Sequence, residues 1–424
     1  MSGQGEPGST RERPSFNGVE LAVGSVVEVD VGNVAHGGHC VARVGDVVAF
    51  VRHALPGERV VIRITDVRPR FVRADTVQVI AAHPDRRAPL CTVSDACGGC
   101  DFQHATESLQ RDLKRQVIAE ALAHQGGLPE SRVAELLVDG VIDLGMHTGW
   151  RSRMRYATMA GHAGHSHVAM HRYRSDDLVD VTSCVIADPV GHQAAIRAAR
   201  DVNAGTQVLM ATGLDGPVVE TSGRASTVVR HDVRTRGRTV EFDVPVEGFW
   251  QVHPKLAPAV IDHLIDVAEP QPGEVWWDLY AGVGPIAAAL ADRVGPPGRV
   301  VAVEGSRAAV EVGAAALRDM PWVQWRRSDV RRWVTRTPTP EPRVDGVVLD
   351  PPRTGAGAAV LEAVVSRRPR VVAIVACDPI ALARDTGLLA RSGYVLSRLR
   401  VWDAFPQTHH MEALAVFRPE DQIS

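Results

Sequence analysis

The second half of this 424-residue chain alternates short apolar runs with amphipathic stretches, and that rhythm restricts the possible folds more than any other feature. The apolar runs include WWDLY, VVAVEG, VDGVVLDPP and VVAIVACDP, and each ends in polar residues or glycine. Between them lie stretches typical of helices, such as PIAAALADRVG and PIALARDTGLLARSG. Strands that alternate with helices indicate a parallel sheet covered by helices on both faces. We therefore expect a doubly wound α/β domain over residues 251–424.

Residues 21–80 follow a different pattern, in which apolar and polar residues alternate in short runs. The runs are separated by turn residues such as Gly37-Gly38 and Pro56-Gly57. Period-two patterning broken by such turns predicts a small antiparallel β-barrel of about five strands. Barrels of this kind often bind oligonucleotides, although a barrel that serves only as a spacer would have the same pattern.

The remaining segments are less regular, and the whole chain is expected to be multidomain. Residues 1–20 are polar and contain Gly, Pro and Ser, which predicts a disordered leader and not a signal peptide. Residues 81–250 hold a cysteine cluster, a helical stretch and short strands, so we expect a central α+β domain there. No run approaches the roughly 20 apolar residues that a membrane span needs. We expect a cytoplasmic, monomeric protein.

The net charge of −3 does not by itself indicate a nucleic-acid-binding protein. Local charge is more informative, because residues 150–175 contain five arginines, four histidines and no acid. Arg151, Arg153 and Arg155 alternate, so a strand would place them on one face. We expect this face to contact RNA phosphates, the alternative being an ordinary solvated face.

Ligands of doubly wound sheets bind beyond the carboxyl ends of the strands, where several chemically suggestive residues fall. Gly282 and Gly284 follow the first apolar run of the α/β domain and permit a tight turn against a ligand. Glu304 ends the second strand and is placed to accept hydrogen bonds from ribose hydroxyls, Asp329 is a third candidate acid, and Asp350 ends the fourth strand. Two glycines without a third favour S-adenosylmethionine over a nicotinamide dinucleotide.

Cys377 directly follows the fifth strand and precedes a helix. A free cysteine is usually a small buried hydrophobe, but a thiol at a helix N-terminus is expected to have a lowered pKa. Cys377 is therefore a candidate nucleophile. The candidate general bases are Glu412, His409 and His410, which precede the last apolar strand.

Together these residues resemble the bacterial RNA (uracil-5-)-methyltransferases, in the branch that methylates 23S ribosomal RNA and carries a TRAM barrel and a [4Fe–4S] cluster. The resemblance covers nearly the whole chain after the leader. It rests on ALPGE at 54–58, Cys91-x5-Cys97-Gly-Gly-Cys100, Phe249-Trp-Gln251, Asp350-Pro-Pro and Cys377. It implies a class I methyltransferase fold for the C-terminal domain. It also implies that the cofactor is bound by Gln251, Tyr280, Glu304 and Asp350.

The resemblance assigns Cys377 as the nucleophile and Glu412 as the base of a covalent mechanism. Carbon 5 of uracil is too weak a nucleophile to attack a sulfonium methyl group unaided. Addition of a thiolate at C6 creates an enolate with charge at C5, which accepts the methyl group before a base removes the C5 proton. The chain departs from the family in having Asp378 where asparagine is usual. A carboxylate there raises the thiol pKa unless it points away.

Cys91, Cys97, Cys100 and the distant Cys184 form a possible ligand set for a metal centre. Their spacing suits either zinc or a [4Fe–4S] cluster, and the resemblance favours the cluster in a structural or RNA-shaping role. Cys40 is expected to lie in the barrel core. The alternatives for the whole protein are a transfer RNA uracil-5-methyltransferase, a methyltransferase that acts on a base nitrogen through Asp350, and a non-catalytic RNA-binding factor.

Overall fold

The computed structural model describes residues 15–16, 19–161, 164–221, 227–336 and 344–422. The chain forms two compact units. The first comprises residues 1–89 and 101–109, and the second comprises residues 90–100 and 110–424. Of the leader expected at residues 1–20, residues 1–14 and 17–18 lie outside the described residues. Ser15–Phe16 (β1) and Val19–Glu20 (β2) pair with each other as antiparallel strands.

The first unit contains a closed five-stranded barrel, which confirms the prediction for residues 21–80. Its strands are β3 (Val26–Ala35), β4 (His39–Val44), β5 (Val47–Arg52), β6 (Arg59–Arg68) and β7 (Phe71–Ala81). They pair in the order β3-β4-β5-β7-β6 around the barrel, and the β5–β7 pair is parallel whereas the others are antiparallel. Cys40 is buried in this barrel, as expected, and its thiol donates to the carbonyl of Ala54 at 3.2 Å.

A buried ion pair fixes the ALPGE turn of the barrel unit. The Glu58 side chain is fully buried, and the Arg86 guanidinium donates to both of its oxygens at 2.5 and 2.7 Å. The backbone amides of Leu55 and His83 donate to the same carboxylate. A buried carboxylate is tolerated only when its oxygens are paired in this way, so Glu58 ties residues 83–86 to the turn.

The second unit contains an antiparallel sheet of five strands in the order β11-β10-β9-β12-β13. The strands are β9 (Arg153–Ala160), β10 (Ser166–His171), β11 (Leu178–Asp180), β12 (Val208–Gly213) and β13 (Gly216–Thr221). Helix α3 (Pro189–Arg200) packs on this sheet through small residues such as Ala195. A separate hairpin follows, formed by β14 (Val228–Arg234) and β15 (Thr239–Pro245).

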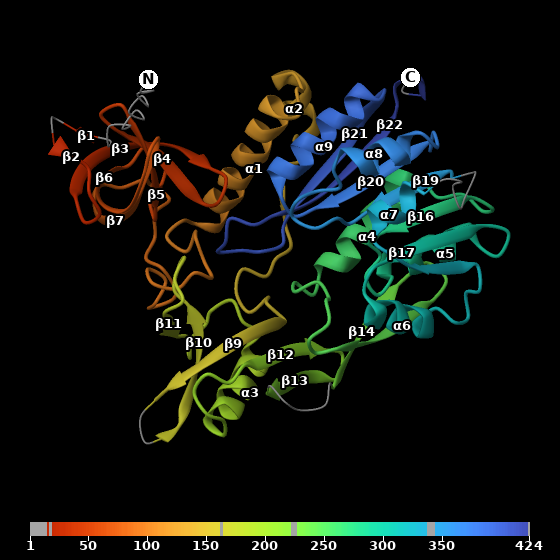
Figure 1. The fold of residues 1–424 in the computed structure, drawn as a ribbon, viewed down its shortest axis with the longest axis horizontal. Helices are drawn as coiled ribbons and strands as arrows, with labels where there is room; N and C mark the ends of the chain where they lie inside the picture. Colours follow the sequence, from red (N-terminus) through yellow and green to blue (C-terminus); the bar gives the residue numbers. More distant parts are fainter. Residues whose placement is uncertain (1–14, 17–18, 162–163, 222–226, 337–343, 423–424) are drawn as a thin grey trace, which may run out of the picture. The chain divides into compact units, whose positions relative to one another are not determined.

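The expected doubly wound domain is a sheet of eight strands in the order β18-β17-β16-β19-β20-β22-β21-β8. Figure 1 shows β16, β17, β19, β20, β21 and β22 of this sheet in the C-terminal part of the chain. Its strands are β8 (Val141–Asp143), β16 (Val275–Leu279), β17 (Arg299–Glu304), β18 (Val323–Arg327), β19 (Gly346–Leu349), β20 (Val371–Ala376), β21 (Tyr394–Asp403) and β22 (Glu412–Pro419). Five consecutive strands from β18 to β20 are parallel, and β22 is antiparallel to both of its neighbours. The edge strand β8 comes from upstream of residue 251, so the sheet recruits a segment expected in the central domain.

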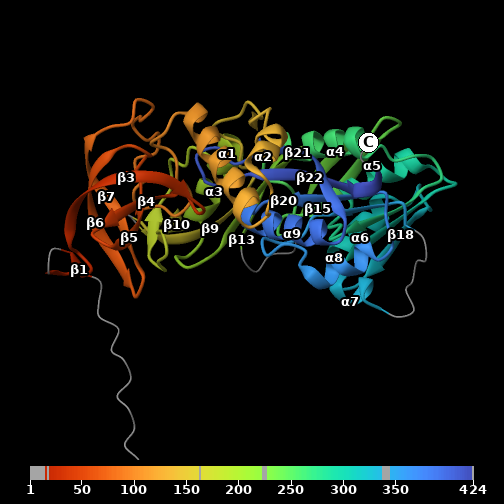
Figure 2. The ribbon, with the colours of Figure 1, turned by 90° about the horizontal axis from the view of Figure 1, so that it is seen from above.

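Helices cover both faces of this sheet, with α4 and α5 on one face and α8 and α9 on the other (Figure 2). The helices are α4 (Leu256–Ala268), α5 (Pro285–Val294), α6 (Arg307–Ala316), α7 (Val330–Val334), α8 (Ala358–Val365) and α9 (Pro379–Arg391). All six residues of β20 are buried, as expected of a strand covered on both faces. The second unit also includes α2 (Glu130–Leu136) and residues 110–124 of α1 (Glu107–His124). None of the described helices is long and apolar enough to span a bilayer.

The register of the parallel strands places their carboxyl ends along one edge. Leu279, at the end of β16, lies beside Val303 of β17 and Leu349 of β19. Leu349 in turn lies beside Ile374 of β20. The residues that follow these strands are therefore neighbours at the same edge, where ligands of such sheets bind.

Candidate active site

The turn after β16 has the open backbone that the two glycines predict. Tyr280, Gly282 and Gly284 all have positive φ angles, of 64°, 56° and 89°. A Cβ atom on Gly284 would meet the Trp325 ring at 2.8 Å, so this glycine is required for packing. A Cβ atom on Gly282 would meet nothing within 4 Å. The turn is thus open at Gly282, where a ligand can approach the backbone.

Glu304 and Asp329, the next two candidate acids, lie near this turn. The Glu304 carboxylate accepts hydrogen bonds from the amides of Gly282 at 3.0 Å and Ser306 at 2.7 Å. Asp329 caps the N-terminus of α7 through one carboxylate oxygen. Burial, and after it the nearby Asp329 carboxylate, raises the pKa of the Tyr280 phenol. The structure therefore brings Tyr280, Gly282, Glu304 and Asp329 together.

Asp350, Cys377 and Glu412 meet at the ends of three neighbouring strands. Asp350 follows β19 and Cys377 follows β20. Glu412 begins the antiparallel β22, and its neighbour Ala413 pairs with the last residue of β20, so Glu412 lies at the same edge. The structure thus places the predicted nucleophile, the predicted base and a predicted cofactor residue side by side.

The predicted lowering of the Cys377 pKa is wrong. Burial raises the pKa of this thiol to about 11, with a further rise from the Glu412 and Asp350 carboxylates, and Arg353 only partly offsets them. The helix dipole is outweighed because the half-buried thiolate would face two carboxyl groups. Asp378 is the departure from the family pattern. Its carboxylate turns to the N-terminus of α9 and accepts from the Ala381 amide at 2.8 Å.

The two carboxyl groups beside the thiol are coupled. Burial raises the pKa of Asp350 to about 7. Burial and the Asp350 charge raise the pKa of Glu412 well above its usual value. Two buried carboxyl groups in proximity favour a state in which one of them holds a proton. This arrangement can exchange a proton near neutral pH, which is what general acid–base chemistry requires.

The rival bases, His409 and His410, lie next to each other in the loop before Glu412, with ring centroids 4.0 Å apart. His410 Nε2 lies 3.4 Å from the Arg353 guanidinium. Both rings are half-buried, whereas Glu412 is 3% exposed. Arg353 therefore contacts His410 and also lowers the pKa of Cys377.

Asp278 in β16 is a polar residue that the sequence interpretation did not select. Its side chain is buried, and its carboxylate oxygens have no hydrogen bond of normal geometry among the described residues, although the nearby Ala287 amide partly stabilises the charged form. Burial, followed by the charges of Asp350 and Glu304, raises its pKa to about 8. The sequence feature that could have identified Asp278 is the position of a single acid within the apolar run WWDLY. Weakly partnered buried oxygens beside the glycine turn suit a ligand that brings its own hydrogen-bond donors.

Replacing Asp278 with asparagine is expected to stabilise the ligand-free protein, increasingly so as pH rises. The folded-state pKa of Asp278 is about 8, above the ordinary value of 3.8, so between these values the folded state keeps a proton that the unfolded chain releases. The free energy of unfolding then falls with pH by up to about 1.4 kcal/mol per unit, a loss that asparagine avoids. Thermal unfolding at about pH 5 and about pH 8 measures the difference. The exposed Asp262→Asn is the control, and a pH-independent difference would contradict the assignment.

Gln251 lies between β15 and α4, in a segment that contacts residues 150–152. The amide and hydroxyl of Ser152 both donate to the Val252 carbonyl at 2.8 Å. The adjacent His253 is buried and stacks on Trp150, with ring centroids 6.3 Å apart. The backbone around Gln251 is thus well anchored, and its contact with a cofactor stays a prediction.

The four predicted ligand cysteines all belong to the second unit. Burial raises the pKa values of Cys97 and Cys184, and the charge of Cys91 raises both further. Cys100 and Cys184 contact one apolar cluster around Trp150. The Gly99 amide donates to the Cys97 sulfur at 3.4 Å. Partly buried thiols with amide donors fit a thiolate-held centre, yet among the described residues no group of three or more His, Cys, Asp or Glu side chains has a metal-binding arrangement.

The expected RNA-binding face of β9 needs correction at Arg153, which is buried. Its guanidinium donates to the carbonyls of Pro245, Val246 and Gly248 at 3.3, 3.0 and 2.7 Å. Burial lowers its pKa to about 10. The β14–β15 hairpin covers it, so Arg153 is a structural residue. Arg155 is exposed and lies beside Gln207, so it stays a candidate for phosphate contact.

Two segments of the chain match known families. Residues 20–77 match the TRAM domain, and residues 341–418 match the family described as tRNA (Uracil-5-)-methyltransferase. The second match includes three of the clustered residues, Asp350, Cys377 and Glu412.

The chain is also similar to whole proteins. An uncharacterized RNA methyltransferase of Streptomyces avermitilis is 38% identical over 94% of this chain and 99% of its own. The 23S rRNA (uracil(1939)-C(5))-methyltransferase RlmD of Alkalilimnicola ehrlichii is 31% identical over 93% of this chain and 97% of its own. The Pyrococcus abyssi tRNA (uracil-54, C5)-methyltransferase, solved in complex with S-adenosyl-L-homocysteine, has the same fold, with a TM-score of 0.65 at 18% identity over 92% of this chain and 99% of its own. The C-terminal sheet is thus a class I methyltransferase fold, and this chain belongs to the family of S-adenosylmethionine-dependent RNA (uracil-5-)-methyltransferases.

Proposed function

We propose that this protein methylates C5 of a uridine in 23S ribosomal RNA through a covalent bond between Cys377 and C6 of the base. The observation that carries the proposal is the juxtaposition of Cys377, Glu412 and Asp350 beside an open glycine turn. Relatives over 30% identical across nearly the whole chain bear the name of a 23S rRNA enzyme, which favours ribosomal over transfer RNA. Membership of an enzyme family disfavours a purely RNA-binding role.

The cofactor S-adenosylmethionine supplies the electrophilic methyl group. The residues that would hold it are Gln251, Tyr280, Glu304, Asp329 and Asp350. The open Gly282 backbone and the weakly partnered oxygens of Asp278 support this location, because they offer space and hydrogen-bond acceptors at one turn.

The side chains at the strand ends would perform the chemistry on the uracil ring. Cys377 Sγ forms a bond to C6, and the electrons of the C5–C6 double bond move onto the C4 carbonyl as an enolate. C5 then acquires the methyl group. Glu412 accepts the C5 proton, the double bond re-forms, and the C6–S bond breaks to return the thiolate. The ring thus exchanges its C5 proton for a methyl group, and Cys377 is regenerated.

A [4Fe–4S] cluster on Cys91, Cys97, Cys100 and Cys184 is the second part of this proposal, with zinc as the alternative. The partly buried, mutually interacting thiols support it, and the cluster would have a structural role because four thiolates leave no iron open. Iron, sulfide and zinc analysis of protein purified without oxygen distinguishes the two. A monomeric state is part of this proposal, and a ribosomal RNA substrate fits a cytoplasmic location.

Trapping with RNA that contains 5-fluorouridine tests the proposed mechanism. Fluorine cannot leave C5 as a proton does, so the methylated adduct should persist as a complex stable to denaturation. Mass spectrometry of digested complex is expected to find the nucleotide on Cys377, and sequencing of the RNA identifies the target uridine. Absence of any covalent complex with 23S rRNA fragments, while methyl transfer to unmodified RNA proceeds, would show a mechanism without the adduct.

A further inference from the structure

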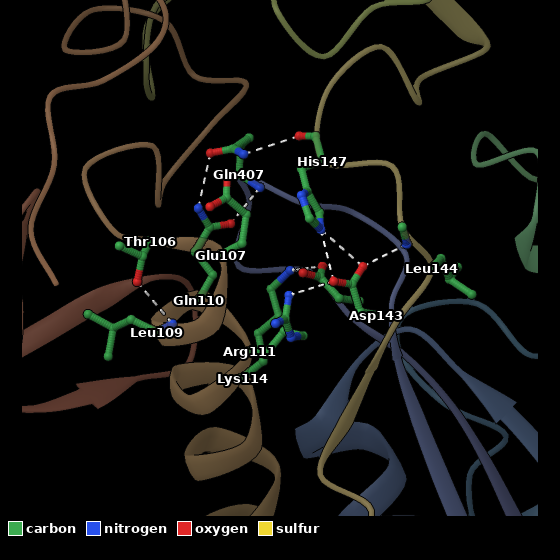
Figure 3. A network of polar contacts seen from close by, with 12 residues as sticks. Thr106, Glu107, Leu109, Gln110, Arg111, Lys114, Asp143, Leu144, His147 and Gln407 are labelled. Carbon is green, nitrogen blue, oxygen red and sulfur yellow. Dashed lines mark hydrogen bonds and ion pairs between the residues drawn. The ribbon is translucent and has the colours of Figure 1, made fainter.

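The loop between β21 and β22 directly precedes Glu412. It contacts helix α1, which comes from a distant part of the sequence, and Figure 3 shows Gln407 of the loop beside Gln110 of the helix. Residues 404–411 form this base loop. Its contacts with α1 span 291 to 297 residues of sequence. Both α1 residues concerned, Gln110 and Lys114, are fully buried and belong to the same unit as the loop.

Lys114 fixes the start of the base loop. Its Nζ donates to Asp403 Oδ1 at 2.5 Å and to the Phe405 carbonyl at 3.1 Å. The Lys114 and Asp403 side chains are 0% and 1% exposed. Asp403 is the last residue of β21, directly after Trp402, which pairs with Glu412 in the sheet. Because a buried charge requires its partner, this ion pair holds the strand end beside Glu412 in one position.

Gln110 fixes the middle of the loop through a reciprocal pair of hydrogen bonds. Its Nε2 donates to Gln407 Oε1 at 3.0 Å, and its Oε1 accepts from the Gln407 backbone amide at 2.8 Å. Gln407 is fully buried and has a φ of 70°, a conformation that non-glycine residues keep only when the surroundings impose it. Gln110 supplies that constraint, so the loop conformation depends on α1.

A second layer of contacts supports this pair. Gln407 Nε2 donates to the His147 carbonyl at 3.1 Å. His147 Nε2 lies 2.9 Å from Asp143 Oδ2, and Arg111 of α1 pairs with the same carboxylate at 3.0 Å (Figure 3). The base loop is therefore enclosed between α1 and the segment that follows β8.

We propose that Gln110 and Lys114 are positioning residues that orient the base loop so that Glu412 reaches the C5 proton. This inference rests on the proposed function, in which Glu412 acts only after methyl transfer. Loosening the loop should therefore slow proton removal more than the preceding addition and methylation. A shift of about 1 Å in a reacting group lowers rates by on the order of 100-fold. The distinguishing sign is accumulation of the methylated covalent complex on ordinary RNA.

The test compares Gln110→Ala with Gln116→Ala in the full-length, cluster-containing protein. Gln116 lies on the same helix, and within the described part of the chain its side chain donates to Glu120, four residues later, so its loss matches the change without touching the loop. Radiolabelled methyl groups and unmodified RNA are used, and free methylated RNA is separated from denaturation-stable complex. Gln110→Ala is expected to release product about 10- to 100-fold more slowly while complex accumulates. Gln116→Ala should behave as the wild type.

Gln407→Gly is the second variant, because glycine removes the side-chain bonds while it accepts the positive φ without strain. It should accumulate complex as Gln110→Ala does, which keeps the test decisive if Gln110→Ala folds poorly. Unchanged product release in both variants, or an equal slowing of complex formation and release, would overturn the positioning role. A wild-type enzyme that never forms complex with 5-fluorouridine RNA would instead refute the proposed function itself.

Discussion

Replacing Cys377 with alanine is expected to abolish methylation, by about 10⁴-fold or more, because removal of a covalent nucleophile leaves only binding and orientation. Without the thiolate, C5 of uracil keeps no enolate character and cannot take up the methyl group. Methyl incorporation into 23S rRNA fragments measures the loss. Folding should be preserved, since alanine is smaller, uncharged and suited to a half-buried helix start.

Cys40→Ala is the matched control for Cys377→Ala. It removes a buried thiol from the barrel unit and is expected to keep methylation. Activity retained in Cys377→Ala would instead indicate transfer to a base nitrogen through the Asp350-Pro-Pro turn, without a covalent step.

The same cysteine sets the pH dependence of the 5-fluorouridine trap. Its pKa of about 11 means that the thiol is protonated at neutral pH. The thiolate fraction, and with it the rate of adduct formation in the free enzyme, should rise about tenfold per pH unit below that value.

Replacing Glu412 with glutamine is expected to lower turnover by about 10²- to 10⁴-fold, the usual contribution of a general base. Addition and methyl transfer precede the step that needs this residue, so methylated RNA should remain attached to Cys377. Glutamine matches Glu412 in size and brings no charge into this buried position, so the variant should fold normally. Denaturing electrophoresis with radiolabelled RNA detects the retained complex.

Glu362→Gln, an exposed change on α8, is the control for Glu412→Gln and should have no effect. Rapid product release by Glu412→Gln would assign proton removal to His409 or His410 instead. The half-buried position of both histidines near Arg353 makes them the natural next candidates.

The sequence by itself determined the architecture at both ends of the chain. Period-two alternation predicts the barrel, and the strand–helix rhythm predicts the parallel sheet, because these patterns reflect local geometry that each segment carries on its own. The same rhythm places Gly282, Glu304, Asp350 and Cys377 after successive strands, and parallel pairing then brings strand ends to one edge. The main outline of the candidate site is thus readable from local pattern and spacing.

Only the tertiary structure decided what surrounds those residues. The high pKa of Cys377, the weakly partnered carboxylate of Asp278 and the burial of Arg153 result from packing between segments far apart in sequence. The contacts of Gln110 and Lys114 with the base loop and the end of β21 likewise join residues nearly 300 positions apart. Desolvation and long-range pairing depend on which side chains meet in the folded chain, and no local periodicity contains that information.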